Sequence, residues 1–126
     1  MRLRFLASVC SVLALVALDG PGANAADAKN GQGVFTRCMA CHTDKKGAPN
    51  GVGPNLFGVV GRKAGSMADF SYSPALKNSG IVWTNQKLDA WIENPLKMVP
   101  GTRMAFAGIS DPKQRADLIA YLDVLK

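Results

Sequence analysis

Residues 38–42 read Cys-Met-Ala-Cys-His, which is the attachment pattern of a c-type haem. In this pattern two thiols bond covalently to the macrocycle, and the residue that follows presents an imidazole to one face of the iron. Because both sulfurs tie the chain to the porphyrin edge, the adjacent histidine is held under the metal. His42 is the only histidine of the chain, so no second imidazole can be an axial ligand. The motif therefore predicts one haem c bound through Cys38 and Cys41, with His42 as an iron ligand.

Other uses of two closely spaced cysteines compete with haem attachment. A redox dithiol of the thioredoxin type belongs in a strand–helix setting, which this sequence does not show. A zinc site normally needs four ligands, and residues 26–126 hold no cysteine or histidine beyond these three. A plain disulfide between Cys38 and Cys41 would leave His42 unexplained. The pattern therefore favours haem attachment over all three alternatives.

The start of the chain reads as a secretory signal peptide. A positively charged beginning is followed by apolar residues 5–18 and by Ala-Asn-Ala at residues 23–25, which is an A-x-A cleavage site. The apolar run is shorter than the about 20 residues of a transmembrane helix, and an uncleaved anchor is the alternative. Cleavage would also remove Cys10, which leaves only the two cysteines of the motif. We expect residues 1–25 to be cleaved and residues 26–126 to form one domain in the periplasm.

The expected domain is short and basic. A chain of this length buries a limited core, and small folds are often completed by a cofactor. The porphyrin would form the centre of that core, so we expect the chain without haem to fold poorly, which circular dichroism can check. The formal net charge is +6, and loss of Arg2, Arg4 and Asp19 with the signal lowers it to +5. Such a surface favours acidic partners, although many of the lysines merely solvate it.

The pattern after the signal predicts helices joined by long loops and no convincing strand, which is the all-α class. Residues 43–65 are rich in Gly, Pro, Asn and Lys, and a structureless loop of that length usually surrounds something functional. We expect it to wrap a flat cofactor. Capping residues and first-turn prolines mark the helix starts, and Asp111 begins a capping box. We expect four helices. The first covers residues 27–38, the second is short and begins at Ser73, the third runs from Thr84 to residue 94, and the last begins at Asp111.

Two features indicate how the first and last helices pack. Leu118, Leu122 and Leu125 form an apolar stripe, which we expect to face the first helix. Gly31 and Gly33 are poor helix residues, and their presence in the first helix indicates a close backbone approach to another element. Both features predict contact between the two ends of the domain.

The second axial ligand must come from a methionine, because there is no second histidine. Met39 lies between the two thioether bonds and cannot reach over the ring, while Met67 and Met98 can serve as ordinary gap-fillers. Met104 follows a Pro-Gly turn at residues 100–101, which stiffens the loop, and apolar residues beyond it can seal the metal from water. The residues thus favour Met104 over Met98.

From residue 38 to its end the chain resembles the class I soluble cytochromes c, the group of mitochondrial cytochrome c and its bacterial periplasmic relatives. The matching segments are residues 38–42, Gly-Pro-Asn-Leu at 53–56, residues 100–109 and residues 117–122. Their order and spacing match as well as the motifs themselves. The resemblance implies a cytochrome c fold, with three main helices, short helices and long loops wrapped around one covalently bound haem.

The resemblance also implies roles for single residues. It makes Met104 the second axial ligand, and it makes the Pro54 carbonyl the acceptor of the other imidazole N–H of His42, which orients the ring. Buried haem propionates need polar partners because an unpaired carboxylate in an apolar core is costly. The residues matched to these partners are Arg62, Tyr72, Trp83 and Thr102.

Two positions depart from the mitochondrial pattern on the Met104 side. Trp91 stands where a tyrosine usually reaches toward the methionine sulfur, and Leu76 where an asparagine usually holds an internal water. Both changes remove hydrogen-bonding groups. We therefore expect a drier pocket there and an altered reduction potential.

The function expected from this site is one-electron transfer by a carrier that is not an enzyme. Histidine and methionine together fill the coordination of the iron, which leaves no position for oxygen, peroxide or substrate. The alternative is a ligand-binding or peroxidatic haem protein, which requires Met104 to be displaced. The resemblance implies a cytochrome bc-type complex as donor and a terminal oxidase or photosynthetic reaction centre as acceptor. We expect a monomer that meets membranes only peripherally and binds no nucleic acid.

Cations close to the ligands in sequence are expected to surround the haem edge. Such a basic face speeds encounter with acidic docking faces, at rates that fall as salt rises. The residues concerned are Arg37, Lys97 and Arg103, together with Lys45, Lys46 and Lys63.

Overall fold

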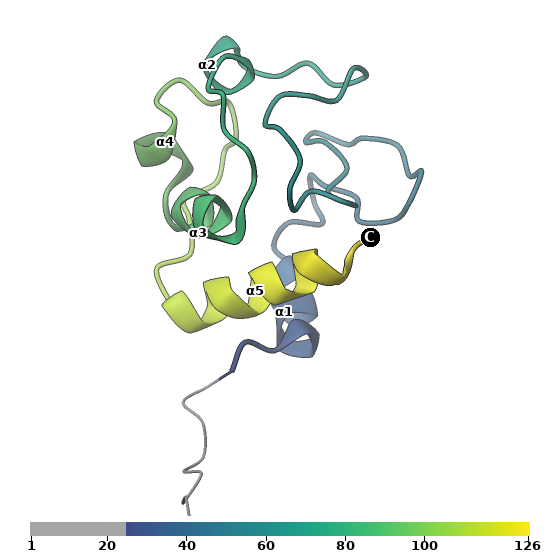
Figure 1. The fold of residues 1–126 in the computed structure, drawn as a ribbon, viewed down its shortest axis with the longest axis vertical. Helices are drawn as coiled ribbons and strands as arrows, with labels where there is room; N and C mark the ends of the chain where they lie inside the picture. The colour runs from purple at the N-terminus through teal and green to yellow at the C-terminus, as the bar shows by residue number, and fades with distance from the viewer. Residues whose placement is uncertain (1–24) are drawn as a thin grey trace, which may run out of the picture.

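The computed structural model describes residues 25–126, so all of the predicted signal peptide except Ala25 lies outside the described residues. Within that range the chain forms helices and loops without a sheet (Figure 1). Three main helices and two single-turn helices agree with the all-α cytochrome c fold expected from the sequence. The helices are α1 (Ala28–Phe35), α2 (Pro74–Lys77), α3 (Asn85–Glu93), α4 (Pro95–Met98) and α5 (Pro112–Val124).

Each helix begins at a residue whose side-chain oxygen accepts a backbone N–H of the first turn. Proline occupies the start of α2, α4 and α5, where its missing N–H breaks no helical bond. At α5 the capping box is incomplete: Asp111 accepts from the Lys113 N–H, but within residues 25–126 no bond from Gln114 returns to it. The caps are Asp27, Ser73, Thr84, Asn94 and Asp111.

Two helix boundaries differ from the prediction. The first helix ends at Phe35 rather than at residue 38, because the following N–H groups bond three residues back, including Cys38 N–H to Phe35 O at 2.7 Å. The sequence predicts no helix between residue 94 and Asp111, but Asn94 caps the further turn α4, which contains Lys97. Both differences lie at helix ends, where local signals are weakest.

Helices α1 and α5 cross at one end of the molecule, as the sequence predicts (Figure 1). A side chain at Gly31 would place its Cβ 1.8 Å from the Asp117 backbone oxygen, so the two backbones are nearly in contact. The aromatic rings of Phe35 and Tyr121 lie 5.3 Å apart in the same interface. The expectation for Gly33 was wrong, because a Cβ there would meet nothing within 4 Å.

The apolar stripe of α5 lies in the core shared with Phe35 of α1, and part of the stripe has a second neighbour. Asp117 and Tyr121 meet α1, whereas Leu118 and Leu122, one position further along the helix, line an internal cavity. Successive helical residues are turned by about 100°, so both surfaces fit on one helix. Helix α5 therefore packs on α1 and also forms a wall of the cavity.

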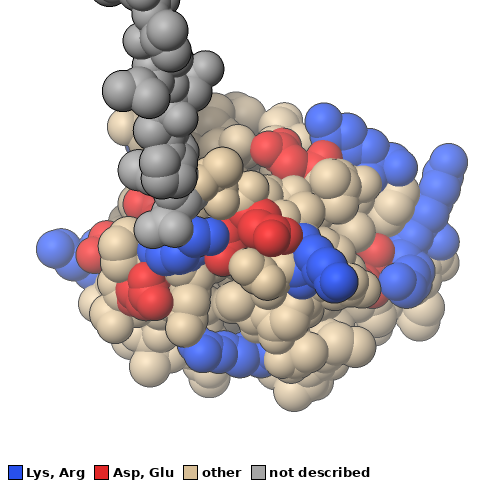
Figure 2. All heavy atoms as spheres, turned by 90° about the horizontal axis from the view of Figure 1, so that it is seen from below, with Lys and Arg blue, Asp and Glu red and all other residues tan. Residues whose placement is uncertain are grey.

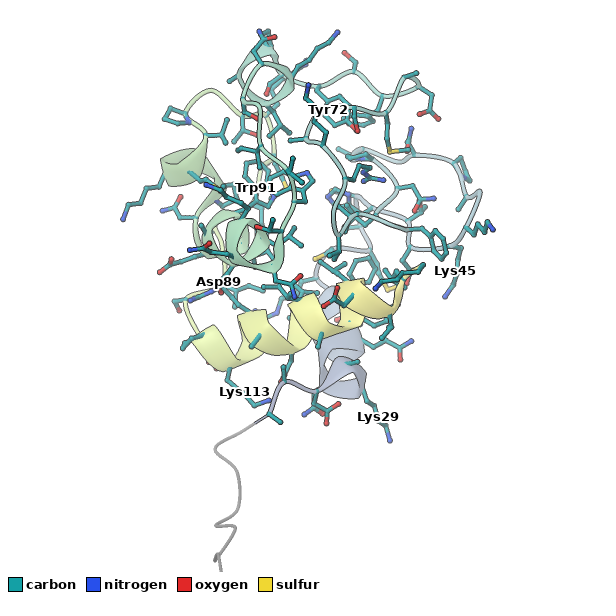
Figure 3. All side chains as sticks on the ribbon, in the orientation of Figure 1. Lys29, Lys45, Tyr72, Asp89, Trp91 and Lys113 are labelled. Atoms are coloured by element: carbon teal, nitrogen blue, oxygen red, sulfur yellow. The ribbon has the colours of Figure 1, made fainter. Side chains whose placement is uncertain are left out.

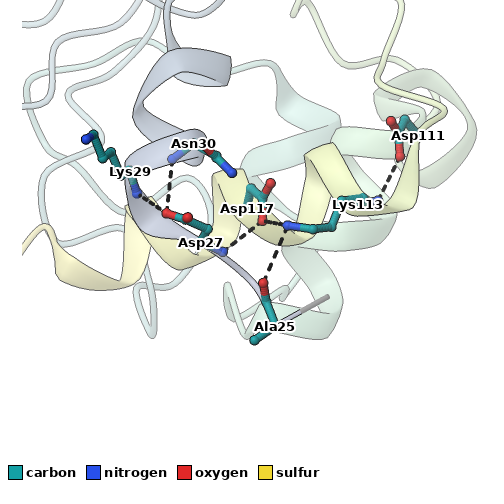
Figure 4. Close-up of polar contacts among 7 residues, drawn as sticks. All are labelled: Ala25, Asp27, Lys29, Asn30, Asp111, Lys113 and Asp117. Atoms are coloured by element: carbon teal, nitrogen blue, oxygen red, sulfur yellow. Dashed lines mark hydrogen bonds and ion pairs between the residues drawn. The ribbon is translucent and has the colours of Figure 1, made fainter. Parts of the chain in front are cut away.

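Polar contacts fasten the start of α1 to α5 (Figure 4). The buried carboxylate of Asp117 accepts the Asp27 backbone N–H at 2.8 Å and pairs with the Lys113 ammonium. Lys113 also donates to the Ala25 carbonyl at 3.4 Å. The Lys113 hydrogen bond, and then that of Asp27, hold the pKa of Asp117 below its usual range. The carboxylate is therefore charged at neutral pH and ties the two ends of the domain together.

The chain between α1 and α2 contains no helix, and polar side chains organise it from within. Asn55 is only 6% exposed, and its amide donates to the carbonyls of Lys45 and Ala48 at 2.8 and 3.0 Å. Its side-chain oxygen accepts the Phe57 N–H at 2.9 Å. These bonds replace a regular ladder and hold the loop in one conformation. No helix of the described residues is long and apolar enough to cross a membrane.

Candidate functional site

A cavity of about 430 Å³ lies between the long loop, α3, α5 and the loop that follows α4. Its volume falls within the range of about 300–1,000 Å³ that is usual for ligand and cofactor sites. The wall is largely apolar, with side chains from α1, α2, α3, α5 and the loops. Among them are Phe35, Leu56, Val59, Trp91, Ile92 and Phe106.

The Cys-x-x-Cys-His motif forms one wall of this cavity. The N–H groups of Cys41 and His42 both donate to the Cys38 carbonyl, at 3.1 and 2.9 Å, so the motif is a tight turn. Both thiols are free, and all three side chains reach the cavity lining. Burial raises the pKa of the Cys38 thiol, with a smaller opposite effect of Arg37. The turn thus presents two thiols and an imidazole to the same space.

The imidazole of His42 is oriented by the loop at residues 53–54. Its Nδ1 lies 2.7 Å from the Pro54 carbonyl oxygen, which can only accept, so Nδ1 carries the proton and Nε2 is left free. Burial lowers the pKa of His42, opposed in part by the Pro54 bond, and this favours the neutral ring that binds metals. These are the neighbours that the resemblance implies for an iron ligand.

Gly53 was not singled out from the sequence, although it belongs to the matching Gly-Pro-Asn-Leu segment. A Cβ at this position would lie 2.3 Å from Cε1 of the His42 ring. The glycine therefore lets the loop lie flat against the imidazole. The signal that could have identified it is its place directly before Pro54, whose carbonyl binds the same ring.

Met104 is the methionine that the structure places at the cavity. Among the described methionines, it alone belongs to the lining. Met39 is 59% exposed, Met67 lines a separate small cavity, and Met98 packs at the end of α4 against the core. Met104 is thus the described methionine that shares this cavity with His42.

The side chains matched to haem propionates are brought together at the same cavity. The guanidinium of Arg62 donates to the carbonyls of Asn55 at 2.9 Å and Phe57 at 3.4 Å. Burial lowers the pKa of Arg62, and nearby Tyr72 partly offsets this. The Tyr72 hydroxyl accepts the Met67 N–H at 3.4 Å, so its own proton remains available to a further acceptor. The four lining residues in question are Arg62, Tyr72, Trp83 and Thr102.

The two positions that depart from the mitochondrial pattern also line the cavity. Trp91 points inward from α3 (Figure 3), and its ring lies 5.2 Å from that of Trp83 in a tilted arrangement. Leu76 adds an aliphatic side chain from α2. This part of the wall is apolar, which fits the expectation of a drier pocket.

Three of the six cations named from the sequence line the cavity: Arg37, Lys63 and Arg103. Within residues 25–126 none of these three forms an ion pair. The other three, Lys45, Lys46 and Lys97, do not belong to the lining. By contrast, acidic and basic side chains are interspersed on the face seen in Figure 2, below α1 and α5. Among the described residues, the cavity lining therefore carries basic side chains and no acidic one.

The sequence and the fold were compared with known proteins. Residues 28–126 match the family model described as cytochrome c. A cytochrome c of Trypanosoma brucei brucei is 58% identical over 81 residues, which cover 64% of this chain and 87% of that protein. A cytochrome c2 of Rhodopila globiformis is 52% identical over 101 residues, covering 79% of this chain and 94% of that protein. The solved structure of cytochrome cH from Methylobacterium extorquens superposes with a TM-score of 0.73 at 52% identity, covering 77% of this chain and 97% of that one.

A covalently attached haem fits the residues of the cavity. The two free thiols and the oriented imidazole come from a single turn, and the space they face is walled by aromatic and aliphatic side chains. A porphyrin is flat and largely apolar, with polar groups at one edge, and the lining offers both surfaces. The chain therefore belongs to the cytochrome c family of non-enzymatic electron carriers, and it binds one haem c covalently through its Cys-x-x-Cys-His motif.

Proposed function

We propose that His42 and Met104 are the two axial ligands of the haem iron and that this chain carries single electrons between two membrane-bound complexes. The observation that carries the proposal is the pairing of ligands at one cavity. His42 has its Nε2 free because Nδ1 is bound to Pro54, and Met104 alone among the described methionines lines the same space.

The chain's residues keep the site closed and fixed. The bound haem supplies a one-electron ferric/ferrous couple. Two protein ligands would leave the iron no open coordination position, and the apolar wall that includes Trp91 and Leu76 would keep water from it. Because Pro54 and the packed Gly53 fix the His42 ring, little rearrangement accompanies a change of charge. Arg62, Tyr72, Trp83 and Thr102 are proposed to bind the propionates.

The donor is proposed to be a cytochrome bc-type complex, and the acceptor a terminal oxidase or a photosynthetic reaction centre. The similarity to bacterial cytochromes c2 supports this choice. Export by a cleaved signal peptide would place the carrier in the periplasm as a monomer. The three exposed cations of the cavity lining, Arg37, Lys63 and Arg103, would face acidic docking surfaces.

A visible spectrum of the purified protein tests the ligation. The ferric form should show a methionine–iron charge-transfer band, and the reduced form should not bind carbon monoxide. Met104→Leu should abolish the band and admit carbon monoxide, whereas Met98→Leu should leave both properties unchanged. A reduced wild type that binds carbon monoxide would instead indicate the alternative, a ligand-binding or peroxidatic haem protein.

Electron-transfer rates at increasing ionic strength test the docking proposal. With an acidic partner complex, the wild-type rate should fall as salt rises, because screening weakens the attraction. Arg37→Gln with Arg103→Gln should lower the low-salt rate and flatten its salt dependence. Lys29→Gln, which removes one exposed charge on α1 away from the cavity lining (Figure 3), is the control and should have a much smaller effect. Rates insensitive to salt in the wild type would contradict electrostatic docking.

A further inference from the structure

We propose that Arg115 of α5 is a positioning residue that holds the Met104 loop closed over the haem. The Met104 loop is the segment from Val99 to Ser110, between α4 and the cap of α5. The proposal rests on the axial role of Met104 proposed above, and it concerns how strongly the chain holds that ligand in place.

The middle of the Met104 loop has few anchors of its own. Around Met104 the only backbone hydrogen bonds of the described loop are local, such as Phe106 N–H to Met104 O at 3.0 Å. The loop meets the rest of the fold at its far end, where the Ile109 N–H donates to Ile92 O of α3 at 2.9 Å. There Gly108, at a φ of 101°, lies against the Glu93 carbonyl, with no room for a side chain. Besides the packing of Met104 and Phe106 against the core, the position of the loop thus depends on what fixes residues 108–110.

Arg115 binds this far end from the other side. Its Nη1 donates to the carbonyl oxygens of Ile109 and Ser110 at 2.9 and 2.8 Å. Ile109 is therefore held through its N–H by α3 and through its carbonyl by α5. Arg115 is only 7% exposed, so these bonds are made where water does not compete.

The guanidinium is itself held in place by α3. Its Nε donates to Asp89 Oδ1 at 2.7 Å, and Asp89 lies where α3 faces α5 (Figure 3). That bond is the main reason why the pKa of Arg115 is raised, so the charge persists despite burial. A planar guanidinium reaches Asp89 through Nε and both loop carbonyls through Nη1, whereas the donors of a lysine all lie on one nitrogen. Hydrogen bonds of Arg115 thus connect Asp89 of α3 to the loop that carries Met104.

Competition between Met104 and added imidazole measures how firmly the loop is held. Imidazole binds ferric iron only when the methionine has left, so a looser loop raises its apparent affinity. In Arg115→Lys holoprotein we expect imidazole to bind about tenfold more tightly than in the wild type, which corresponds to about 1.4 kcal/mol. Loss of the methionine charge-transfer band provides the readout. Asp89→Asn, which changes no residue of the loop, should raise the apparent affinity for imidazole about threefold.

Two comparisons separate positioning from a general loss of stability. Lys113→Met, on the same helix, breaks the pair with Asp117 and has no bond to the loop, so it should lower unfolding stability while imidazole affinity stays within about twofold of wild type. In the Arg115→Lys background, Asp89→Asn should have no further effect, because its influence passes through the guanidinium. An unchanged affinity in Arg115→Lys, or a parallel rise in Lys113→Met, would overturn the proposal.

Hydrogen exchange keeps the test independent of the ligation itself. In Arg115→Lys the Ile109 amide should exchange faster relative to amides inside α5, because one side of its anchor is gone. If the wild type lacks the charge-transfer band, the axial role of Met104 fails. Faster exchange of the Ile109 amide in Arg115→Lys would still show that Arg115 holds the loop. If Arg115→Lys does not accumulate with haem, the imidazole affinity and the Ile109 exchange rate are measured in Asp89→Asn instead. Wild-type values of both would reject the role of Arg115 in holding the loop.

Discussion

Gly31→Ala is expected to disrupt the contact between α1 and α5 severely. The added Cβ would lie 1.8 Å from the Asp117 carbonyl oxygen and 2.5 Å from its carbonyl carbon. Real Cβ contacts stay above 3.0 Å, so the two backbones must separate by at least about 1.2 Å. Neither atom belongs to a flexible side chain, so the strain cannot be relieved by a rotamer change.

The cost follows from two contributions. Overpacking of a tight contact costs about 1–3 kcal/mol, and here the rigid backbone favours the upper end. Separation of the helices also stretches the 2.8 Å bond from the Asp27 N–H to the charged Asp117 carboxylate. Hydrogen bonds to charged groups contribute about 1.5–3 kcal/mol. We expect Gly31→Ala to lower the free energy of unfolding by about 3 kcal/mol.

Gly33→Ala is the matched control, because it makes the same change in the same helix. A Cβ at Gly33 meets nothing within 4 Å, so only the helix preference of alanine remains. This variant should be more stable than wild type by about 0.5–1 kcal/mol. Guanidinium unfolding, followed by circular dichroism and by the Soret band, measures the free energies of unfolding of the haem-loaded wild type, Gly31→Ala and Gly33→Ala. Equal effects of the two substitutions, or a loss below about 1 kcal/mol for Gly31→Ala, would refute the reasoning.

Further predictions concern the haem pocket and the loop that follows the motif. Gly53→Ala should displace the His42 ring, since the new Cβ would lie 2.3 Å from Cε1, and the absorption spectrum should lose its normal His-ligated form; an unchanged spectrum would show that the loop yields instead. Burial, together with the Asp44 carboxylate, raises the pKa of Tyr121 from 10.0 to about 12, so its contribution to stability is full below pH 10 and is lost as the pH rises to about 12. Tyr121→Phe should therefore unfold with a flatter pH dependence in that window, and a slope like that of the wild type would contradict this assignment. Leu76→Asn should shift the midpoint potential by bringing a polar group to the Met104 side, and a midpoint equal to that of the wild type would count against a dry pocket.

Much of the site could be predicted because its signals are local. Residues 38–42 form a single turn that carries both thiols and the imidazole, so neighbouring residues in the sequence are enough to predict their chemistry. The all-α class also followed from short-range signals, because a cap or a first-turn proline acts within one helical turn. The end of α1 at Phe35 and the extra turn α4 escaped prediction, since terminal turns are decided by weak competing hydrogen bonds.

The order of residues already specifies the chemistry of the site: one attachment motif, one histidine, a small set of methionines and an all-helical chain around them. Tertiary structure alone decided which surfaces meet. It turned Asp117 toward Gly31 and Leu118 toward the cavity, and it set Arg115 between Asp89 and the Met104 loop. These contacts join segments that are remote in the chain. Local composition marked Gly31 as a point of close backbone approach, but it did not identify Asp117 as the partner. Close packing of the whole domain fixes these contacts, because a displacement of about 1 Å turns a favourable contact into a steric clash or a lost hydrogen bond.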